Sequence, residues 1–102
     1  MAKKLPQQVY KLICRVPRGR VTTYGSIARA LKVPKASRAI GAVLRANQHP
    51  IVVPCHRVVM SDGRLGGYGG VDTKGKKAML LKKEGVEIAK GRVDLSRYLF
   101  KF

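Results

Sequence analysis

The stretch IVVPCHRVV, residues 51–59, constrains the fold of this chain more than any other. Isoleucine and valine dominate it, and a β-branched run of this kind predicts a buried strand. A proline, a cysteine, a histidine and an arginine interrupt the run halfway, although buried polar groups need partners or a function. The chain has 102 residues, enough for one hydrophobic core. We therefore expect a single domain over residues 1–102, with any functional site on that one scaffold.

Hydrophobic spacing on either side of this run predicts helices. Apolar residues recur at three- and four-residue spacing in four segments, and Gly85 is placed to end the last of them. Strand-like segments at 51–53 and 57–60, a turn at 61–64 and a glycine-rich loop at 66–70 lie between the third and fourth helices. The tail, residues 86–102, carries enough apolar side chains to pack back onto the body. The helices are expected over 5–16, after the cap Thr23 through Leu31, over 36–46 and over 73–83.

The second and third helices, joined by a tight turn, have the pattern of a helix-turn-helix. Arg38 and Arg45 flank small residues on the exposed face of the third helix. An ordinary helical hairpin fits this spacing equally well, but the charge of the chain favours DNA. We predict a mainly α fold with a short β-hairpin, of the winged helix-turn-helix type, with the third helix in the DNA groove. The small residues are Ala36, Ser37, Ala39, Gly41 and Ala42.

The charge of the chain is extreme. Lysine and arginine number 22 against five acidic residues, which gives a formal net charge of +17. Such an excess implies a polyanionic partner, with nucleic acid as the first candidate. A solvated surface suited to heat or salt is the alternative. We find no membrane-spanning run and no signal peptide, so no membrane partner is expected.

Two cysteines without a CxxC pair predict neither a disulfide framework nor a zinc site. We therefore expect an intracellular, cytoplasmic protein. Cys14 lies in a helical segment and is interpreted as buried filler, since unpaired cysteine is among the most buried residue types. Cys55 is different, because His56 follows it directly.

Cys55, His56 and Glu84 together suggest proton-relay chemistry. A thiol becomes a strong nucleophile as the thiolate, and a histidine polarised by a carboxylate can accept its proton, directly or through a water. In an extended strand the two neighbouring side chains would point to opposite faces, unless Pro54 bends the chain there. Glu84 stands at a helix C-terminus, where the helix dipole disfavours an anion. We expect His56 to be its partner, with an ordinary surface glutamate as the alternative.

Several motifs in order resemble one known family. PCHRVV is preceded by VTTYGSIA (residues 21–28) and SRAIGAVLRAN (37–47), and is followed by GGYGG (66–70) and LLKKEG (80–85). This order and spacing resemble the C-terminal, active domain of the O6-alkylguanine-DNA alkyltransferases over roughly residues 5–86. The resemblance implies direct repair of alkylated duplex DNA in a single turnover.

The resemblance also implies a role for individual residues. Cys55 would accept the alkyl group irreversibly, His56 would act as general base through a water, and Glu84 would orient His56. Tyr24 would crowd the target phosphate and help to protonate the leaving base. Arg38 would enter the duplex in place of the flipped base.

The remaining implied contacts form two sets. The third helix would lie in the minor groove, and the residues that bind DNA would be Arg38, Tyr24, Ser37, Ala36, Ala39, Gly41, Ala42 and Arg45. The base pocket would consist of Val58, Tyr68, Gly69, Gly70, Asn47 and Pro50. Gly69 stands where the family often has a serine.

Alternatives stay open at this point. Family members usually carry an N-terminal domain, sometimes with a zinc ion, which this chain lacks, so we expect no metal. We also expect no cofactor, and a monomer is the default expectation. The nearest rival is an alkyltransferase-like sensor that binds alkylated DNA without repairing it, although such proteins commonly have tryptophan in place of Cys55. A transcription regulator with PCHRVV as mere core, or one domain of a fusion with another repair enzyme, are further possibilities.

Overall fold

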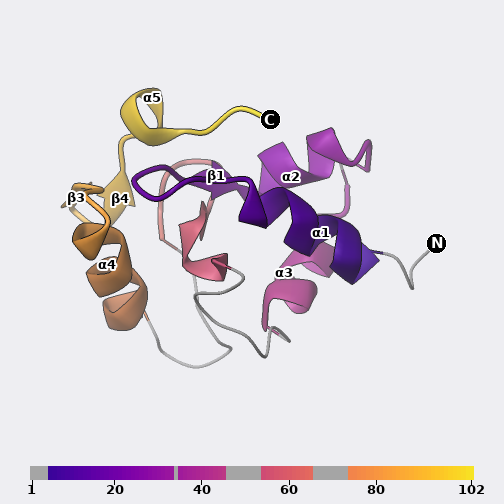
Figure 1. Ribbon diagram of the computed structural model, residues 1–102, viewed down its shortest axis with the longest axis horizontal. Helices are drawn as coiled ribbons and strands as arrows, with labels where there is room; N and C mark the ends of the chain where they lie inside the picture. The colour runs from indigo at the N-terminus through magenta and orange to yellow at the C-terminus, as the bar shows by residue number, and fades with distance from the viewer. Residues whose placement is uncertain (1–4, 34, 46–53, 66–73) are drawn as a thin grey trace.

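The computed structural model describes residues 5–33, 35–45, 54–65 and 74–102. The described part is mostly helical with two small sheets, as the sequence predicts (Figure 1). Its elements in chain order are α1 (Leu5–Cys14), β1 (Thr22–Thr23), α2 (Tyr24–Ala30), α3 (Ser37–Arg45), the 3₁₀-helix η2 (Cys55–Arg57), β2 (Val58–Val59), α4 (Lys74–Lys83), β3 (Ile88–Ala89), β4 (Arg92–Val93) and α5 (Leu95–Tyr98).

A short parallel pair of strands lies between two groups of elements. β1 pairs with β2 so that Thr22 is opposite Val58 and Thr23 is opposite Val59. In Figure 1, helices α1, α2 and α3 gather to the right of β1, and α4, the β3–β4 hairpin and α5 gather to the left. Segments far apart in sequence therefore meet around β1 and β2.

Two hydrophobic clusters follow from this arrangement. Successive residues of a strand point to opposite faces, and Val58 packs in one cluster while Val59 packs in the other. The first cluster contains Val9, Ile13, Ile27, Ala28, Ile40, Leu44, Cys55 and Val58. The second contains Val21, Val59, Leu65, Leu81, Val86, Val93 and Tyr98.

The helix signals of the sequence are mostly confirmed. The hydroxyl of Thr23 accepts a hydrogen bond from the backbone N–H of Ser26 and so caps α2 at its N-terminus. Gly85 follows α4 with φ of +91°, a conformation that glycine adopts without strain. α1 ends at Cys14, two residues before the predicted end, and Val16 beyond it is still buried.

The predicted strand at 57–60 is confirmed at Val58 and Val59 but not at Arg57 or Met60. Residues Cys55–Arg57 form a 3₁₀-helix, and only Val58 and Val59 pair as a strand. Pro54 precedes the helix with φ of −79° and ψ of 67°, and its ring removes a backbone donor from any ladder. Cys55 and His56 are therefore successive residues of a tight helix, in which their side chains need not point to opposite faces. Residues 51–53 lie outside the described ones.

The tail packs back onto the body, as predicted. Val86, Val93 and Tyr98 are buried in the second cluster, and a bridge joins Val21 to Leu99. The short β-hairpin of the fold lies here, as β3 and β4. The turn at 61–64 is also confirmed, with Gly63 at φ of +89°.

Candidate active site

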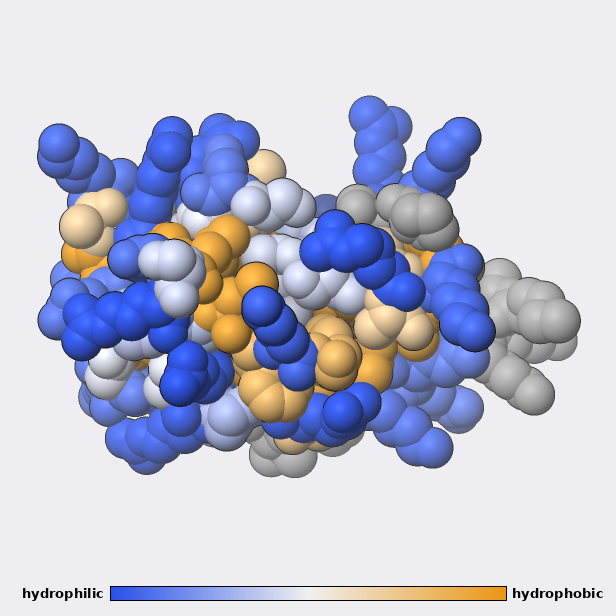
Figure 2. All heavy atoms as spheres, turned by 90° about the horizontal axis from the view of Figure 1, so that it is seen from above, coloured by the Kyte–Doolittle hydropathy of each residue, from blue (hydrophilic) through white to orange (hydrophobic). Residues whose placement is uncertain are grey.

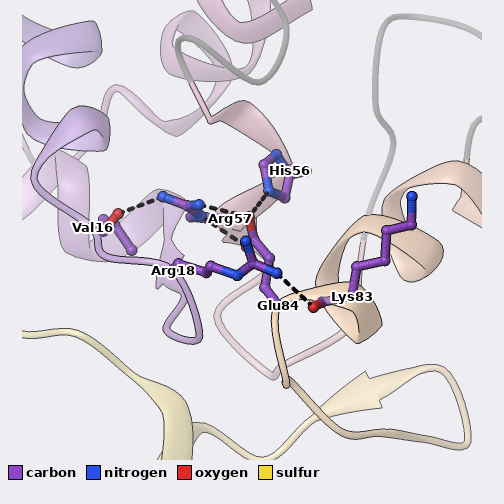
Figure 3. A network of polar contacts seen from close by, with 6 residues as sticks. All are labelled: Val16, Arg18, His56, Arg57, Lys83 and Glu84. Atoms are coloured by element: carbon purple, nitrogen blue, oxygen red, sulfur yellow. Dashed lines mark hydrogen bonds and ion pairs between the residues drawn. The ribbon is translucent and has the colours of Figure 1, made fainter.

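Glu84, directly after α4, is the centre of a polar network (Figure 3). His56 Nε2 lies 3.0 Å from Glu84 Oε2, which confirms the predicted pairing. The chain holds these side chains together because η2 and α4 pack against each other. Arg18 donates to the carbonyl of Lys83 at 3.0 Å and so satisfies one of the last carbonyls of α4.

Arg57 is a member of this network that the sequence reasoning missed. Its Nε donates to Glu84 Oε1 at 2.9 Å, and its Nη2 donates to Glu84 Oε2 at 2.6 Å. A third donor, Nη1, binds the carbonyl of Val16 at 2.9 Å. Arg57 therefore ties the segment after α1 to η2 and to the end of α4. Its position in PCHRVV was a signal that could have found it.

The network fixes the protonation states of Glu84 and His56. Burial opposes ionisation of Glu84, but hydrogen bonds from Arg57 and His56 outweigh it and hold the pKa of this carboxyl below its ordinary value. Burial lowers the pKa of His56, although its hydrogen bond to Glu84 opposes the shift. An ionised carboxylate can only accept, so Nε2 of a neutral His56 carries the proton. Nδ1 is then the basic nitrogen.

Cys55 lies in the first hydrophobic cluster with only 5% of its surface exposed. Two tyrosines are within electrostatic reach of it, Tyr10 from α1 and Tyr24 at the start of α2. Burial raises the pKa of both phenols, and the negative charge that Cys55 can carry adds to the shift. Both tyrosines therefore stay neutral and can act as hydrogen-bond donors. Tyr10 already donates to the carbonyl of Val43 in α3 at 3.0 Å.

Lys77 on α4 also interacts electrostatically with Cys55, and with His56. Its side chain is 1% exposed. The sequence reasoning missed it, because it considered only apolar residues of this helix as inward-facing. The available signal was its spacing from Leu81 and Glu84, which places all three on one helical face.

A hollow of about 660 Å³ lies beside this centre. Tyr24 connects the hollow to the polar network, because it lines the hollow and is also within electrostatic reach of Cys55. The turn at 60–64 forms part of the wall, which the sequence reasoning did not anticipate. The lining residues are Tyr24, Arg38, Gly41, Arg45, Met60, Ser61, Asp62 and Arg64.

A comparison with known families identifies the family of this chain. The model described as "6-O-methylguanine DNA methyltransferase, DNA binding domain" matches residues 4–86. The chain belongs to this family. Because the matching model is that of the DNA-binding domain, the match does not bear out the narrower prediction of the C-terminal active domain only.

Curated members of the family are longer than this chain. A bifunctional methyltransferase/endonuclease of Picrophilus torridus is 47% identical over 93 residues, 90% of this chain and 30% of that protein. A methylated-DNA–protein-cysteine methyltransferase of Methanosarcina mazei is 44% identical over 79 residues, 76% of this chain and 48% of that protein. The chain thus spans less than half the length of these relatives.

A solved structure matches along almost its whole length. The crystal structure of S. pombe Atl1 in complex with damaged DNA containing O6-carboxymethylguanine has a TM-score of 0.89 and 30% identity. The match covers 98% of this chain and 97% of that chain. This likeness confirms the predicted helix-turn-helix-like fold.

The helix that the sequence predicts to enter the DNA groove is α3, and its exposed face is largely as predicted. Arg38, Ala39, Ala42 and Arg45 are exposed, and Gly41 is half-buried. The prediction that Ala36 lies on the exposed face of this helix is partly wrong, because Ala36 precedes α3 and packs against the first cluster. Ser37 is the first residue of α3.

Of the remaining predicted residues, Cys14 needs a correction and five others lie outside the residues that the structure describes. Cys14 is exposed, not buried, since it occupies the outer side of the last turn of α1. Val58 is fully buried in β2. Five residues of the predicted base pocket lie outside the described residues: Asn47, Pro50, Tyr68, Gly69 and Gly70.

Within the described ranges, we find no group of three or more histidine, cysteine or acidic residues that could hold a metal ion. The same residues include no helix long and apolar enough to cross a membrane.

Proposed function

We propose that this chain repairs DNA by direct reversal, with an irreversible transfer of the alkyl group of O6-alkylguanine to Cys55. The observation that carries the proposal is the buried thiol of Cys55 beside the hydrogen-bonded set of His56, Glu84 and Arg57. This is the arrangement that activates a thiol by an oriented base. The enzyme would be a single-turnover methylated-DNA–protein-cysteine methyltransferase.

The proposed step balances without a cofactor. The Cys55 thiol loses its proton to His56, directly or through a water, and the sulfur attacks the alkyl carbon. A carbon–sulfur bond forms as the bond from that carbon to guanine O6 breaks, and the electron pair stays with guanine. The guanine regains one proton, for which the neutral phenol of Tyr24 is the proposed donor. The products are a thioether on Cys55 and an unmodified guanine.

A base inside a duplex hides its O6 substituent from a buried thiol, so the substrate base must leave the stack. We propose that α3 enters the minor groove, where exposed Ala39 and Ala42 permit close approach, and that Arg38 fills the space of the flipped base. Arg38 lines the hollow that Tyr24 connects to the site. Val58, Gly41 and Ser37 would complete the contacts that the structure describes, as the resemblance implies.

The excess of basic residues supports a duplex partner. Figure 2 shows long hydrophilic side chains projecting around one face, with hydrophobic atoms between them. Lysine and arginine contacts to phosphates supply affinity that does not depend on sequence and falls steeply with salt. Such binding suits a search for lesions at any position.

A second candidate is a damage sensor that binds alkylated DNA without repairing it. The observation in its favour is the match to Atl1 along 98% of this chain and 97% of that one, in a structure with damaged DNA. The thiol of Cys55 and its relay favour repair, because a sensor has no need of a nucleophile.

The deciding experiment is the intact mass of the protein after incubation with excess duplex containing O6-methylguanine. A gain of one methylene mass, mapped to the peptide that contains Cys55, is expected. Tight, lesion-preferring binding without any mass gain would reject transfer and support the sensor.

A further inference from the structure

Lys77 is an unusual lysine, because its side chain is buried to 1% exposure while Lys82 and Lys83 on the same helix are exposed. Lysine is almost never fully buried unless it is paired, since its charge is costly to remove from water. Because burial of a lysine is costly, we looked for a function of Lys77 at this position.

The surroundings of Lys77 point to the reaction centre. α4 packs against η2, and Lys77 interacts electrostatically with both Cys55 and His56 of that segment. Glu84 lies about two helical turns further along. Its carboxylate is engaged by His56 and by two donors of Arg57.

We propose that the ammonium group of Lys77 is a positioning residue of the site that stabilises the thiolate of Cys55. Under this proposal, which rests on the proposed function, two sets of residues together produce the reactive thiolate. The relay of His56 and Glu84 removes the proton from the thiol, and Lys77 stabilises the charge that remains on sulfur. The predicted repair chemistry needs both, because the thiolate is the nucleophile.

The electrostatics of the cluster support this division. Burial lowers the pKa of Lys77 to about 8, and the negative charge of Cys55 opposes that shift. Lys77 also contributes to the lowered pKa of His56, which helps to keep the imidazole neutral and able to accept a proton. Among the described residues, Tyr10 and Tyr24 also feel the charge of Cys55, and both are neutral phenols; Arg45 acts on Tyr24. At neutral pH Lys77 is therefore the cationic partner that α4 provides for the thiol.

The test is the ionisation of the thiol itself, measured without DNA. In a Cys14→Ser background, the rate of iodoacetamide modification of Cys55 is followed against pH by peptide mass. Lys77→Met should raise the pKa of the thiol by about one unit and slow its modification about tenfold near pH 7. Lys82→Met, which removes an exposed charge from the same helix, should leave the profile unchanged. An unchanged profile in folded Lys77→Met would overturn the proposal.

A reciprocal measurement covers the case in which Lys77→Met does not fold. Coupling between two charges acts equally on both partners. The titration of Lys77, followed by NMR of its side chain, should therefore shift to lower pH in Cys14→Ser/Cys55→Ser than in Cys14→Ser. Equal titration in the two proteins would reject the interaction.

These readouts separate the inference from the proposed repair function. Alkylated DNA that leaves the mass of the wild-type protein unchanged, combined with a shifted thiol profile in Lys77→Met, would reject alkyl transfer and keep the role of Lys77. A mass gain with an unshifted profile would do the reverse.

Discussion

The two groups of elements on either side of β1 and β2 use basic residues in opposite ways. In the group of α1, α2 and α3, Arg38 and Arg45 are exposed and line a hollow. Around α4 and η2, Lys77 is buried and Arg57 is largely covered by its contacts. Charge at the surface attracts a polyanion from a distance, whereas buried charge sets the ionisation of its neighbours. The comparison predicts that binding and chemistry can be broken separately.

The largest expected effect comes from removing the thiol at the boundary of the two groups. Cys55→Ala should abolish alkyl transfer completely, because no other group could retain the alkyl carbon as a thioether at this place. Affinity for alkylated duplex should persist, since α3 is unaffected. The measurement is intact mass beside a DNA-binding titration. Continued removal of methyl groups from DNA would show that Cys55 is not the acceptor.

Glu84→Gln should break the chemistry without breaking the binding. The neutral amide no longer holds His56 as an oriented base, and general-base catalysis is worth at least about 100-fold in rate. We expect transfer to slow by about that factor, with DNA affinity within about twofold. Single-turnover kinetics on O6-methylguanine duplex measure the first, and a binding titration the second. An unchanged transfer rate would remove Glu84 from the mechanism.

Arg57→Leu tests whether the buried ion pair of Arg57 and Glu84 also contributes to the free energy of unfolding. The change leaves the partly buried carboxylate of Glu84 without its bidentate partner, and loss of one member of a buried pair costs about 3 kcal/mol. Urea denaturation measures this cost. As a control, Glu87→Gln disrupts the exposed pair with Arg97 and should cost less than about 1 kcal/mol. Equal losses in the two variants would contradict the distinction between buried and exposed pairs.

The same contrast explains how much could be predicted from the sequence. The cap at Thr23 was predictable because capping depends on residues within one turn. The pairing of Glu84 with His56 was predictable because an acid at a helix C-terminus opposes the dipole and needs a compensating partner. Exposed Arg38 and Arg45 follow from helical spacing alone.

The misses concern tertiary contacts and local backbone geometry. Arg57 turns inward because distant segments supply the carboxylate of Glu84 and the carbonyl of Val16, which the sequence around Arg57 does not show. Lys77 was missed although its spacing from Leu81 places it on the buried face of α4. The strand predicted at 57–60 starts one residue late, at Val58, because the 3₁₀ turn after Pro54 takes up Arg57. Cys14 is exposed because a general preference of cysteine for the interior does not fix the side of a particular helix.

Arg38→Ala should affect the interaction with duplex DNA and leave the chemistry at Cys55 unchanged. If Arg38 holds the flipped-out state of the base, transfer on duplex should slow about tenfold, which corresponds to about 1.4 kcal/mol. Transfer from a free-base substrate such as an O6-alkylguanine should change little, because no duplex has to open. Lys82→Ala, which removes one exposed charge from α4, is the matched control for lost phosphate attraction. Equal losses on duplex and free base would reject the role in base flipping.

The smallest expected effect is a pH dependence of stability that arises from the buried groups around α4 and η2. The pKa of His56 is lowered in the folded protein, so the unfolded chain binds the proton more readily below its ordinary pKa of about 6.5. Stability from this group is therefore complete above that pH and is lost progressively as the pH falls toward the lowered value. Glu84, whose folded pKa is also lowered, adds a further loss below its ordinary pKa. Urea midpoints between pH 8 and pH 5 should fall for the wild-type protein and fall less for His56→Gln, which cannot take up the proton. Parallel curves would mean that His56 is equally ready to protonate in both states, and its assignment as a neutral buried base would then fail.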